Sequence, residues 1–432
     1  MYFPVRWLVR AGVSCAAFCA TTGICLPQDV PKGDIPQEWA ESQVIERFMA
    51  MSPHVRELRA GEDLAQAKAR TRTVYANPSV SYSREGAGYN EFFEATQTLP
   101  TSGRIRYLRE AGAAAVSAAG ANRDAVLWSL RSDVRLAFYR MVASQGRVRL
   151  LTSGVGEVEQ LIRVLRQREQ EGEGSRYDRL RAERELAELR ADVTSANTLI
   201  AQAAARLNAL LPEDTRVQRV TGTLQPVTAP PLIDELLLRA TAARAELRTE
   251  QQNLRRYQLE AEAARRLRHP EPQISAGLKR ADVTSGIPPN LFSNTTRIGL
   301  VFSISIPLPV FHDGRYEVAE YQAEQEQIKA RLAVLVRQIR TEVQGARAVL
   351  ALRIDALADY QRESAAAGIE LTRIARVAWE EGELGILELL DSLRVNRLTT
   401  LRLLDLQAAS KEASIELERV LGEELKSGEV RP

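Results

Sequence analysis

Side chains able to do chemistry are few in this sequence of 432 residues, and they form no recognisable catalytic set. No zinc-ligand spacing occurs, and the glycine-rich stretch "GEGS" at 172–175 lacks the lysine of a phosphate-binding loop. Two acids, Glu388 and Asp391, are three positions apart, which puts both carboxylates on one face of a helix. These patterns argue against an enzyme, and we predict no catalytic residue, no cofactor and no metal site. The histidines are far apart in the sequence: His54, His269 and His312.

The first 25 residues are expected to be an export signal. Arg6 and Arg10 supply positive charge, a short apolar core follows, and small residues precede a cleavage point before Leu26. A transmembrane anchor is the alternative, but the apolar core is shorter than a bilayer-spanning helix requires. The processed chain would contain neither disulfides nor thiolate ligands, because all the cysteines lie in this segment. They are Cys15, Cys19 and Cys25.

The composition favours long helices, which would have to position any functional side chain. The chain is rich in Ala, Arg, Glu and Leu, poor in aromatic residues, and has a formal net charge of +2. So small a net charge provides no strong field to attract nucleic acid. Two tracts, 101–211 and 310–431, contain no proline, and the first carries the heptad seam of a coiled coil. The seam positions are Ala182, Leu186, Leu189, Val193, Ala196, Ile200, Ala203, Leu207 and Leu210.

The two halves of the chain share motifs in the same order, which indicates an internal repeat. Each half is predicted to contain a helix, two strands, a long helix, a glycine break and a further helix. The second half has extra residues at 280–296, which we interpret as a lengthened loop. The matched pairs are "NPSVSYS" (77–83) with "EPQISAG" (271–277), "LPTSGR" (99–104) with "LPVFHDGR" (308–315), and "EGEGSRYDRL" (171–180) with "EGELGILELL" (381–390).

Alternating apolar and polar residues predict a β-hairpin in each half, at 78–99 and at 272–307. A half-buried hairpin of a soluble protein is one explanation. A transmembrane barrel is the other, and the small or polar opposite face favours it because a barrel has lipid outside and water inside. The alternation is clearest in "TRIGLVFSISI" (296–306), whose large apolar residues are Ile298, Leu300, Phe302, Ile304 and Ile306.

Each helical tract can pack against itself only if the chain reverses. The glycines available for the reversals are Gly172 and Gly174 in the first half and Gly382 and Gly385 in the second. Glycine tolerates the left-handed backbone that a sharp turn needs. The two hairpin tips would then lie far from the strands, at one end of the molecule. The alternative is a helical kink without a functional role.

This set of paired motifs, with four strands and two helical hairpins, resembles the TolC family of outer-membrane efflux channels over nearly the whole processed chain. Within that family, the sequence is most similar to the outer-membrane components of heavy-metal and cation efflux systems. The resemblance implies a homotrimer in which three chains form a twelve-stranded barrel in outer-membrane lipid. Their helices would form a hollow cylinder across the periplasm.

The resemblance also implies two partners. In the family, the hairpin tips close the periplasmic end of the channel and dock onto a periplasmic adaptor protein, which links to an inner-membrane RND-type pump. By match to the family, the adaptor-docking residues would be Gly172, Gly174, Ser175, Tyr177, Gly382, Gly385 and Leu387.

The narrow entrance of these channels is ringed by acidic residues just beyond the second tip. The matching positions here are Glu388 and Asp391, and threefold symmetry would bring six carboxylates to one cation-favouring constriction. The same spacing in the first hairpin gives Asp178 and Arg181, where the arginine would pair with acids and hold the tips shut. The alternative is that these are ordinary charges on a solvated helix.

The sequence therefore predicts a mainly α-helical protein with a membrane β-barrel portion. Its parts would be an export signal (1–25), a first repeat (26–230) with a tip near 172–175, and a second repeat (231–432) with a tip near 382–385. The predicted function is an outer-membrane exit duct of a tripartite efflux system, with heavy-metal cations as one candidate substrate. A soluble periplasmic coiled-coil adaptor or scaffold is the alternative, although it leaves the alternating strands unexplained. An exported enzyme is the third possibility.

Overall fold

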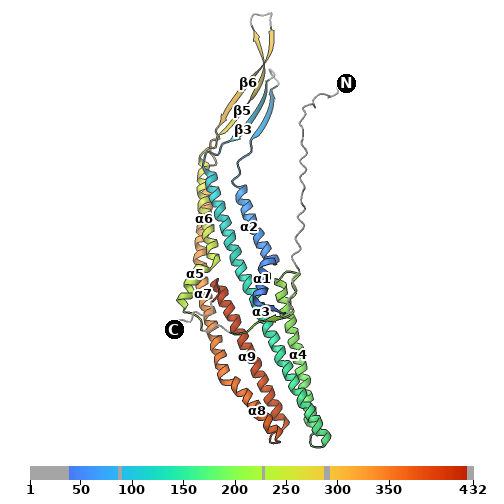
Figure 1. Ribbon diagram of the computed structural model, residues 1–432. Coiled ribbons are helices and arrows are strands. Elements are labelled where there is room, and N and C mark those ends of the chain that lie inside the picture. The colour runs from blue at the N-terminus through green and yellow to red at the C-terminus, as the bar shows by residue number, and fades with distance from the viewer. Residues whose placement is uncertain (1–37, 86–89, 226–228, 287–291, 426–432) are drawn as a thin grey trace, which may run out of the picture. The chain divides into compact units, whose positions relative to one another are not determined.

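The computed structural model describes residues 38–85, 90–225, 229–286 and 292–425 (Figure 1). The predicted export signal at 1–25 lies outside these residues. Helices predominate, as the composition predicted, and the main sheet has four strands. None of the described helices is long and apolar enough to cross a lipid bilayer.

Two helical hairpins contain the longest helices of the chain. In the first hairpin, α3 has 68 residues and therefore measures about 100 Å at about 1.5 Å per residue. In the second, α7 continues through a π-helical turn, η2, into α8, and α9 packs against both α7 and α8. The bounds are α3 (Arg104–Glu171), α4 (Arg176–Leu210), α7 (Arg315–Tyr360), η2 (Gln361–Ala365), α8 (Ala366–Glu380) and α9 (Ile386–Leu421).

The predicted heptad seam holds the first hairpin together. The seam line that starts at Ala182 and repeats every seven residues to Ala203 is buried throughout. The intervening seam residues, such as Leu186 and Val193, are half-buried, while the arginines and glutamates of α4 lie mostly outside the seam. The buried seam residues are Ala182, Leu189, Ala196, Ala203 and Leu207.

Shorter helices pack along the long ones and join the two halves of the chain. Helix α2 packs against α3, and α6 packs against both α3 and α7, so α6 connects the first hairpin to the second. Pro53 begins α2, where its fixed φ suits the first helical turn. The bounds are α1 (Glu41–Met51), α2 (Pro53–Thr71), α5 (Ile233–Ala243), α6 (Ala245–Arg265) and the 3₁₀ turn η1 (Arg266–Arg268).

The main sheet is antiparallel throughout, in the order β2-β3-β5-β6. The interpretation of 280–296 as a lengthened loop was wrong, because β5 and β6 stay paired from Arg280 opposite Ile298 to Gly286 opposite Phe292. These strands continue beyond β3, whose first residue, Asn90, pairs with Ala281. The bounds are β2 (Ser79–Glu85), β3 (Asn90–Thr98), β5 (Gln273–Gly286) and β6 (Phe292–Ser305).

Two further strands were not predicted from the sequence. β1 (Trp39–Ala40) and β4 (Val220–Thr221) pair in parallel, so the chain has more than the four strands expected. Strands of two residues are too short to show an alternating pattern, which explains why sequence reasoning missed them.

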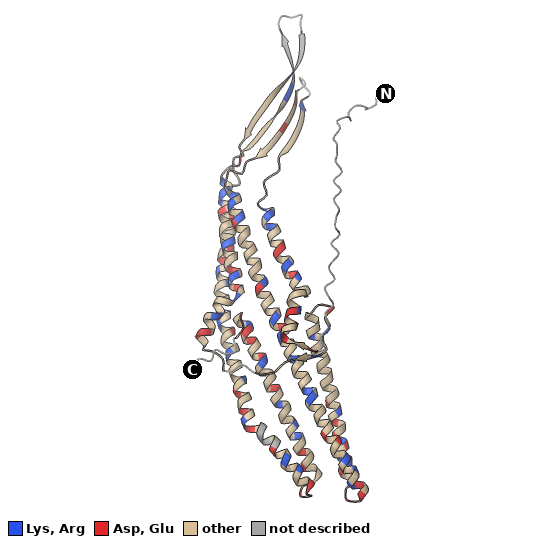
Figure 2. Cartoon of the chain, viewed as in Figure 1, with Lys and Arg blue, Asp and Glu red and all other residues tan. Residues whose placement is uncertain are grey.

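One face of the main sheet is apolar and exposed. The register places Tyr82 beside Phe93, Phe93 beside Leu278, and Leu278 beside Leu300. On the edge strand β6, the Phe302 side chain is 75% exposed. The opposite face is mostly small or polar, and Figure 2 shows far fewer charged residues on the described strands than on the helices. The sheet edges formed by β2 and β6 have no neighbouring strand in the described part of the chain.

Three hydrophobic clusters bury the helices against one another. The first surrounds Phe138 of α3 and includes side chains of α1, α4, β1 and β4. The second contains residues from both hairpin tips, among them Leu189 and Trp379, so the two tips lie side by side. The third surrounds Ile339 of α7 and includes side chains of α5, α6 and α9.

A buried charged network connects α1, α3 and α9 next to the first cluster. The Arg135 guanidinium bonds the Glu41 carboxylate at 2.6 Å and also bonds Glu418, while the Tyr139 hydroxyl donates to Glu41. Burial raises the pKa of the Glu41 carboxyl, but the hydrogen bonds from Tyr139 and Arg135 outweigh this effect and lower the pKa below its usual value. The network therefore depends on an ionised Glu41.

Candidate functional site

The two hairpin tips reverse the chain with the same backbone motif. At the first tip, Gly172 has a left-handed φ of 79°, and the Glu173 N–H donates to the Arg168 carbonyl at 2.9 Å. At the second, Gly382 has φ 80°, and the Glu383 N–H donates to the Ala378 carbonyl at 2.8 Å. Both tips are Schellman motifs, in which glycine avoids the steric penalty of the left-handed conformation.

The other two tip glycines, Gly174 and Gly385, do not adopt the left-handed conformation. Gly385 has an extended backbone, with φ −77° and ψ 168°, and begins α9. Gly174 is not among the positive-φ glycines of the described chain. A Cβ on Gly174 would come within 2.8 Å of the Glu169 nitrogen, so this position needs glycine because two backbone segments approach closely.

The remaining predicted docking residues also lie at the tips. Ser175 caps α4, since its hydroxyl accepts a hydrogen bond from the Tyr177 N–H at 3.1 Å. The Tyr177 side chain is 61% exposed, and Leu387 is exposed at the start of α9. Between the tips, the Arg168 guanidinium lies 4.6 Å from the ring centroid of Trp379. The tips thus form one packed unit that presents an exposed aromatic and an exposed aliphatic side chain.

A charged groove runs between α4 and α9 just behind the tips, with a volume of about 240 Å³. It brings together two of the predicted constriction residues, Arg181 and Asp391, whereas Glu388 and Asp178 do not line it. No ion pair joins Arg181 to an acid within the described residues. Its Nη1 instead lies 3.5 Å from the Tyr177 hydroxyl. The lining residues are Arg181, Arg184, Glu185, Glu188, Leu387, Leu390, Asp391 and Arg394.

The ion pair that does join the two hairpins here was missed by sequence reasoning. The Arg397 guanidinium of α9 bonds the Glu185 carboxylate of α4 at 2.8 Å. The two side chains are only 12% and 16% exposed, so each would be a poorly solvated charge without the other. They come from different halves of the chain, and no local spacing in the sequence links them.

Glu388 and Asp391 lie in the first two turns of α9 and are both exposed. The Glu388 carboxylate folds back against the residue that precedes α9: its Oε2 lies 2.8 Å from the position that a Cβ on Gly385 would occupy. Nothing in the described part of the chain neutralises Asp391 by an ion pair. The carboxylates of Glu388 and Asp391 are therefore both exposed to solvent near the tips.

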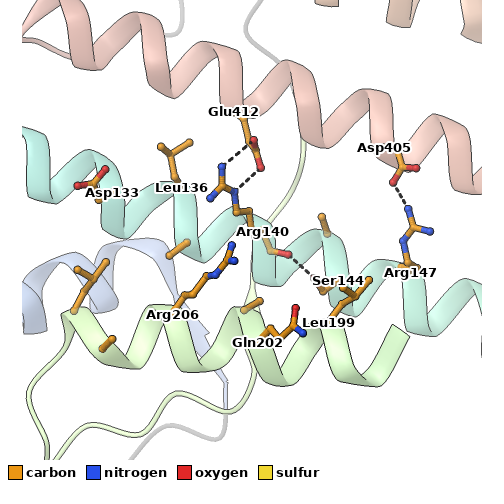
Figure 3. A pocket seen from close by; sticks show the side chains of 15 residues that line it. Asp133, Leu136, Arg140, Ser144, Arg147, Leu199, Gln202, Arg206, Asp405 and Glu412 are labelled. Carbon is orange, nitrogen blue, oxygen red and sulfur yellow. Dashed lines mark hydrogen bonds and ion pairs between the residues drawn. The ribbon is translucent and has the colours of Figure 1, made fainter. Parts of the chain in front are cut away.

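A second, larger groove lies midway along α3, between α4 and α9, with a volume of about 630 Å³ (Figure 3). Its wall carries acids and bases in equal number. Arg140 bonds Glu412 at 3.0 Å, and Arg147 bonds Asp405. Phe138 of α3 packs against side chains of α1. The α3 residues that line this groove, such as Arg140 and Arg147, lie on the opposite side of α3. The charged lining residues are Asp133, Arg140, Arg147, Arg206, Asp405 and Glu412.

Within the described residues, no group of three His, Cys, Asp or Glu side chains is arranged to hold a metal ion. No protein-family model matches the sequence. No curated protein matches it either.

Solved structures of outer-membrane channels share the fold of this chain. CusC, described for conformational changes that accompany folding and transmembrane channel formation, is 21% identical with a TM-score of 0.69, over 89% of this chain and 92% of CusC. The Neisseria gonorrhoeae MtrE outer membrane channel in its open state is 20% identical with a TM-score of 0.65, over 90% of each chain. Vibrio cholerae VceC is 15% identical with a TM-score of 0.67, over 89% of this chain and 97% of VceC. The chain therefore has the TolC-family fold, as its paired motifs predicted.

Proposed function

We propose that the chain is the outer-membrane exit duct of a tripartite efflux system and that it works as a homotrimer. The observation that carries this proposal is the exposed apolar face on a sheet with two open edges. Apolar surface left in water costs about 25 cal/mol per Å², so side chains such as Phe302 and Leu300 require a cover. Lipid is a suitable cover because the face is continuous across all four strands.

The open edges account for the proposed trimer. Unpaired backbone groups cannot remain inside a bilayer, so β2 and β6 each need another strand. Pairing the β6 of one copy with the β2 of the next satisfies both edges when the ring closes. Three copies with four strands each would give the twelve-stranded barrel that the family resemblance implies.

The mid-helix groove of Figure 3 suits the wall of a passive duct. It lies on the side of α3 opposite the α1 layer, and we place it toward the bore. Ion pairs such as Arg140–Glu412 leave this wall without a strong excess of either sign. A wall of balanced charge binds neither cations nor anions tightly, which allows solutes to pass.

The tips are the proposed docking surface for a periplasmic adaptor, which in turn would connect to an inner-membrane pump. Tyr177 and Leu387 are exposed there, beside the two chain reversals. Aromatic and aliphatic side chains that protrude from an ordered surface are typical anchors of protein–protein interfaces.

Glu388 and Asp391 are the proposed acidic constriction. With threefold symmetry they would bring six carboxylates together, and a multivalent cation would relieve their mutual repulsion. In planar bilayers, a trivalent cation added on the periplasmic side should block the wild-type channel. The double variant Glu388→Ala/Asp391→Ala should resist this block, and equal block of both proteins would remove the two residues from the constriction. Heavy-metal cations are a candidate cargo on the strength of the resemblance and of this ring.

Location and assembly test the whole proposal. The mature protein should be found with the outer membrane, require detergent for extraction, and have the mass of a trimer in light scattering. A monomer released with the soluble periplasmic contents would refute the duct and favour a periplasmic coiled-coil adaptor or scaffold.

A further inference from the structure

A cationic cavity lies where the sheet meets the helices. It is bounded by the start of α3, by the η1 turn with the residues after it, and by residues 307–312 between β6 and α7, and its volume is about 400 Å³. Four of its lining side chains are basic: Arg104, Arg266, His269 and His312. The one acidic lining residue, Glu271, accepts a hydrogen bond from Ser102 at 2.5 Å.

The two arginines of the cavity lack acidic partners. Neither Arg104 nor Arg266 forms an ion pair with any residue that the structure describes. The Arg266 guanidinium donates to the Tyr107 hydroxyl at 3.3 Å and lies over the Tyr107 ring. The Nε of Arg104 is buried without a hydrogen-bond acceptor. A buried donor without an acceptor is costly, and two guanidinium groups on one cavity repel each other. An anion in the cavity, bound by the outer nitrogens of both guanidinium groups, would relieve the repulsion between them.

Exposed apolar side chains adjoin this cationic cavity. Leu308, Val310 and Phe311 lie on the segment that lines it, and Phe311 is 93% exposed. The same segment begins two residues after β6, whose last exposed large apolar residue is Ile304. A ligand that satisfies the whole site therefore needs a negatively charged group for the cavity and apolar chains for its surroundings.

We propose that this cavity binds the phosphate of a phospholipid headgroup and that the acyl chains lie against the apolar face of β6. Guanidinium groups match phosphate oxygens in geometry and form charge-assisted hydrogen bonds with them. Basic pockets at membrane boundaries bind lipid headgroups for the same reason. The proposal rests on the membrane location proposed above, and it makes Arg104 and Arg266 ligands for a structural lipid.

Native mass spectrometry of the full chain, extracted in a mild detergent, tests the site. Phosphatidylglycerol is added, and the lipids retained per chain are counted for wild type and for the variants Arg104→Met and Arg266→Met. Arg268→Met is the matched control, because Arg268 is an exposed arginine of the same η1 turn that does not line the cavity. Each cavity variant should lose about one retained lipid per chain and bind phosphatidylglycerol at least tenfold more weakly, while the control should match wild type.

Two further ligands identify the recognised group. Diacylglycerol, which lacks the phosphate, should not be retained. Inorganic phosphate should compete only at concentrations far above those of the lipid, because it lacks the acyl chains. Arg104→Lys is a second variant, which keeps the test valid if Arg104→Met does not fold. Lysine keeps the positive charge but lacks the paired N–H donors of a guanidinium group, so this variant should retain lipid less well than wild type.

Several results would overturn the proposal. They are equal lipid retention by wild type and the cavity variants, equal retention of diacylglycerol, or inorganic phosphate binding as tightly as the lipid. A trimer that dissociates in Arg104→Met while its chains keep their lipid would show that another protein chain fills the cavity. Failure of the proposed function would differ from all of these, since the wild-type protein would then be a soluble monomer.

Discussion

A lysine placed on the apolar face of β6 should prevent membrane insertion, whereas a lysine on the neighbouring residue should not. Phe302 belongs to the exposed apolar face, and Ser303 belongs to the opposite face, where it pairs with Ser275. A lysine facing lipid at the middle of the bilayer costs about 2–4 kcal/mol. Because each 1.4 kcal/mol is a factor of ten, Phe302→Lys should reduce the inserted fraction about 30-fold to 700-fold per chain.

The matched variant Ser303→Lys keeps its charge in the aqueous interior of the proposed barrel, so insertion should stay within about twofold of wild type. Trimers in the outer-membrane fraction would be quantified on gels, and unfolding in urea would be followed after reconstitution into liposomes. If Phe302→Lys inserts as well as Ser303→Lys, the apolar face does not contact lipid and the reasoning from the strand register fails.

Three further predictions concern the helices. Gly172→Val should lower the free energy of unfolding by about 1–2 kcal/mol, since valine must adopt φ 79°, whereas Gly385→Ala at φ −77° should cost less than about 1 kcal/mol; equal losses in denaturant titrations would contradict this. Arg397→Met should cost about 3–5 kcal/mol by leaving the Glu185 charge buried, and adding Glu185→Leu should restore part of the loss; strict additivity in the double-mutant cycle would argue against the pair. Because the folded-state pKa of Glu41 is lowered, its carboxylate stabilises the protein above the unfolded-state pKa of about 4.5, and this stabilisation is lost as the pH falls through the folded-state pKa. The stability difference between wild type and Glu41→Gln should therefore be largest near neutral pH and shrink in acid, and a constant difference would contradict the network.

Much of the fold could be predicted from the sequence because its signals are periodic. The seam through Ala182 and Leu189 repeats over several heptads, and the alternation from Ile298 to Ile306 extends over a whole strand. Such patterns indicate which face of a helix or strand is apolar, and they do so without information about what covers that face. For this reason the long helices, the strands of the main sheet and the paired chain reversals could be anticipated.

Other features depend on contacts between distant segments, and the sequence carries no local sign of them. The pair Arg397–Glu185 joins residues from opposite halves, and the parallel pair of β1 and β4 involves only two residues on each strand. The glycine motif at the tips predicted the reversals, but it did not distinguish the left-handed Gly172 from Gly174, which is required by a close backbone approach.

The candidate site was predicted in part. The sequence located the tips, and the structure brings Arg181 and Asp391 into one groove. It does not pair Arg181 with an acid in the described chain. Across the groove, Glu185 of α4 pairs with Arg397, which lies farther along α9. The constriction proposed for Glu388 and Asp391 would be formed by three neighbouring copies, a contact that leaves no pattern in the sequence of one chain.

Cross-linking between the two edge strands tests the central proposal most directly. The only cysteines in the sequence lie in residues 15–25, so cysteines introduced into β2 and β6 would be the only thiols of the described chain. Pairs such as Ser81→Cys with Ser303→Cys, together with neighbouring positions to sample the register, should be joined by short thiol cross-linkers in outer-membrane vesicles. A closed ring of three chains should give covalent dimers and trimers, with no species above three chains. Cross-links confined to single chains, or a ladder that extends beyond three, would contradict it.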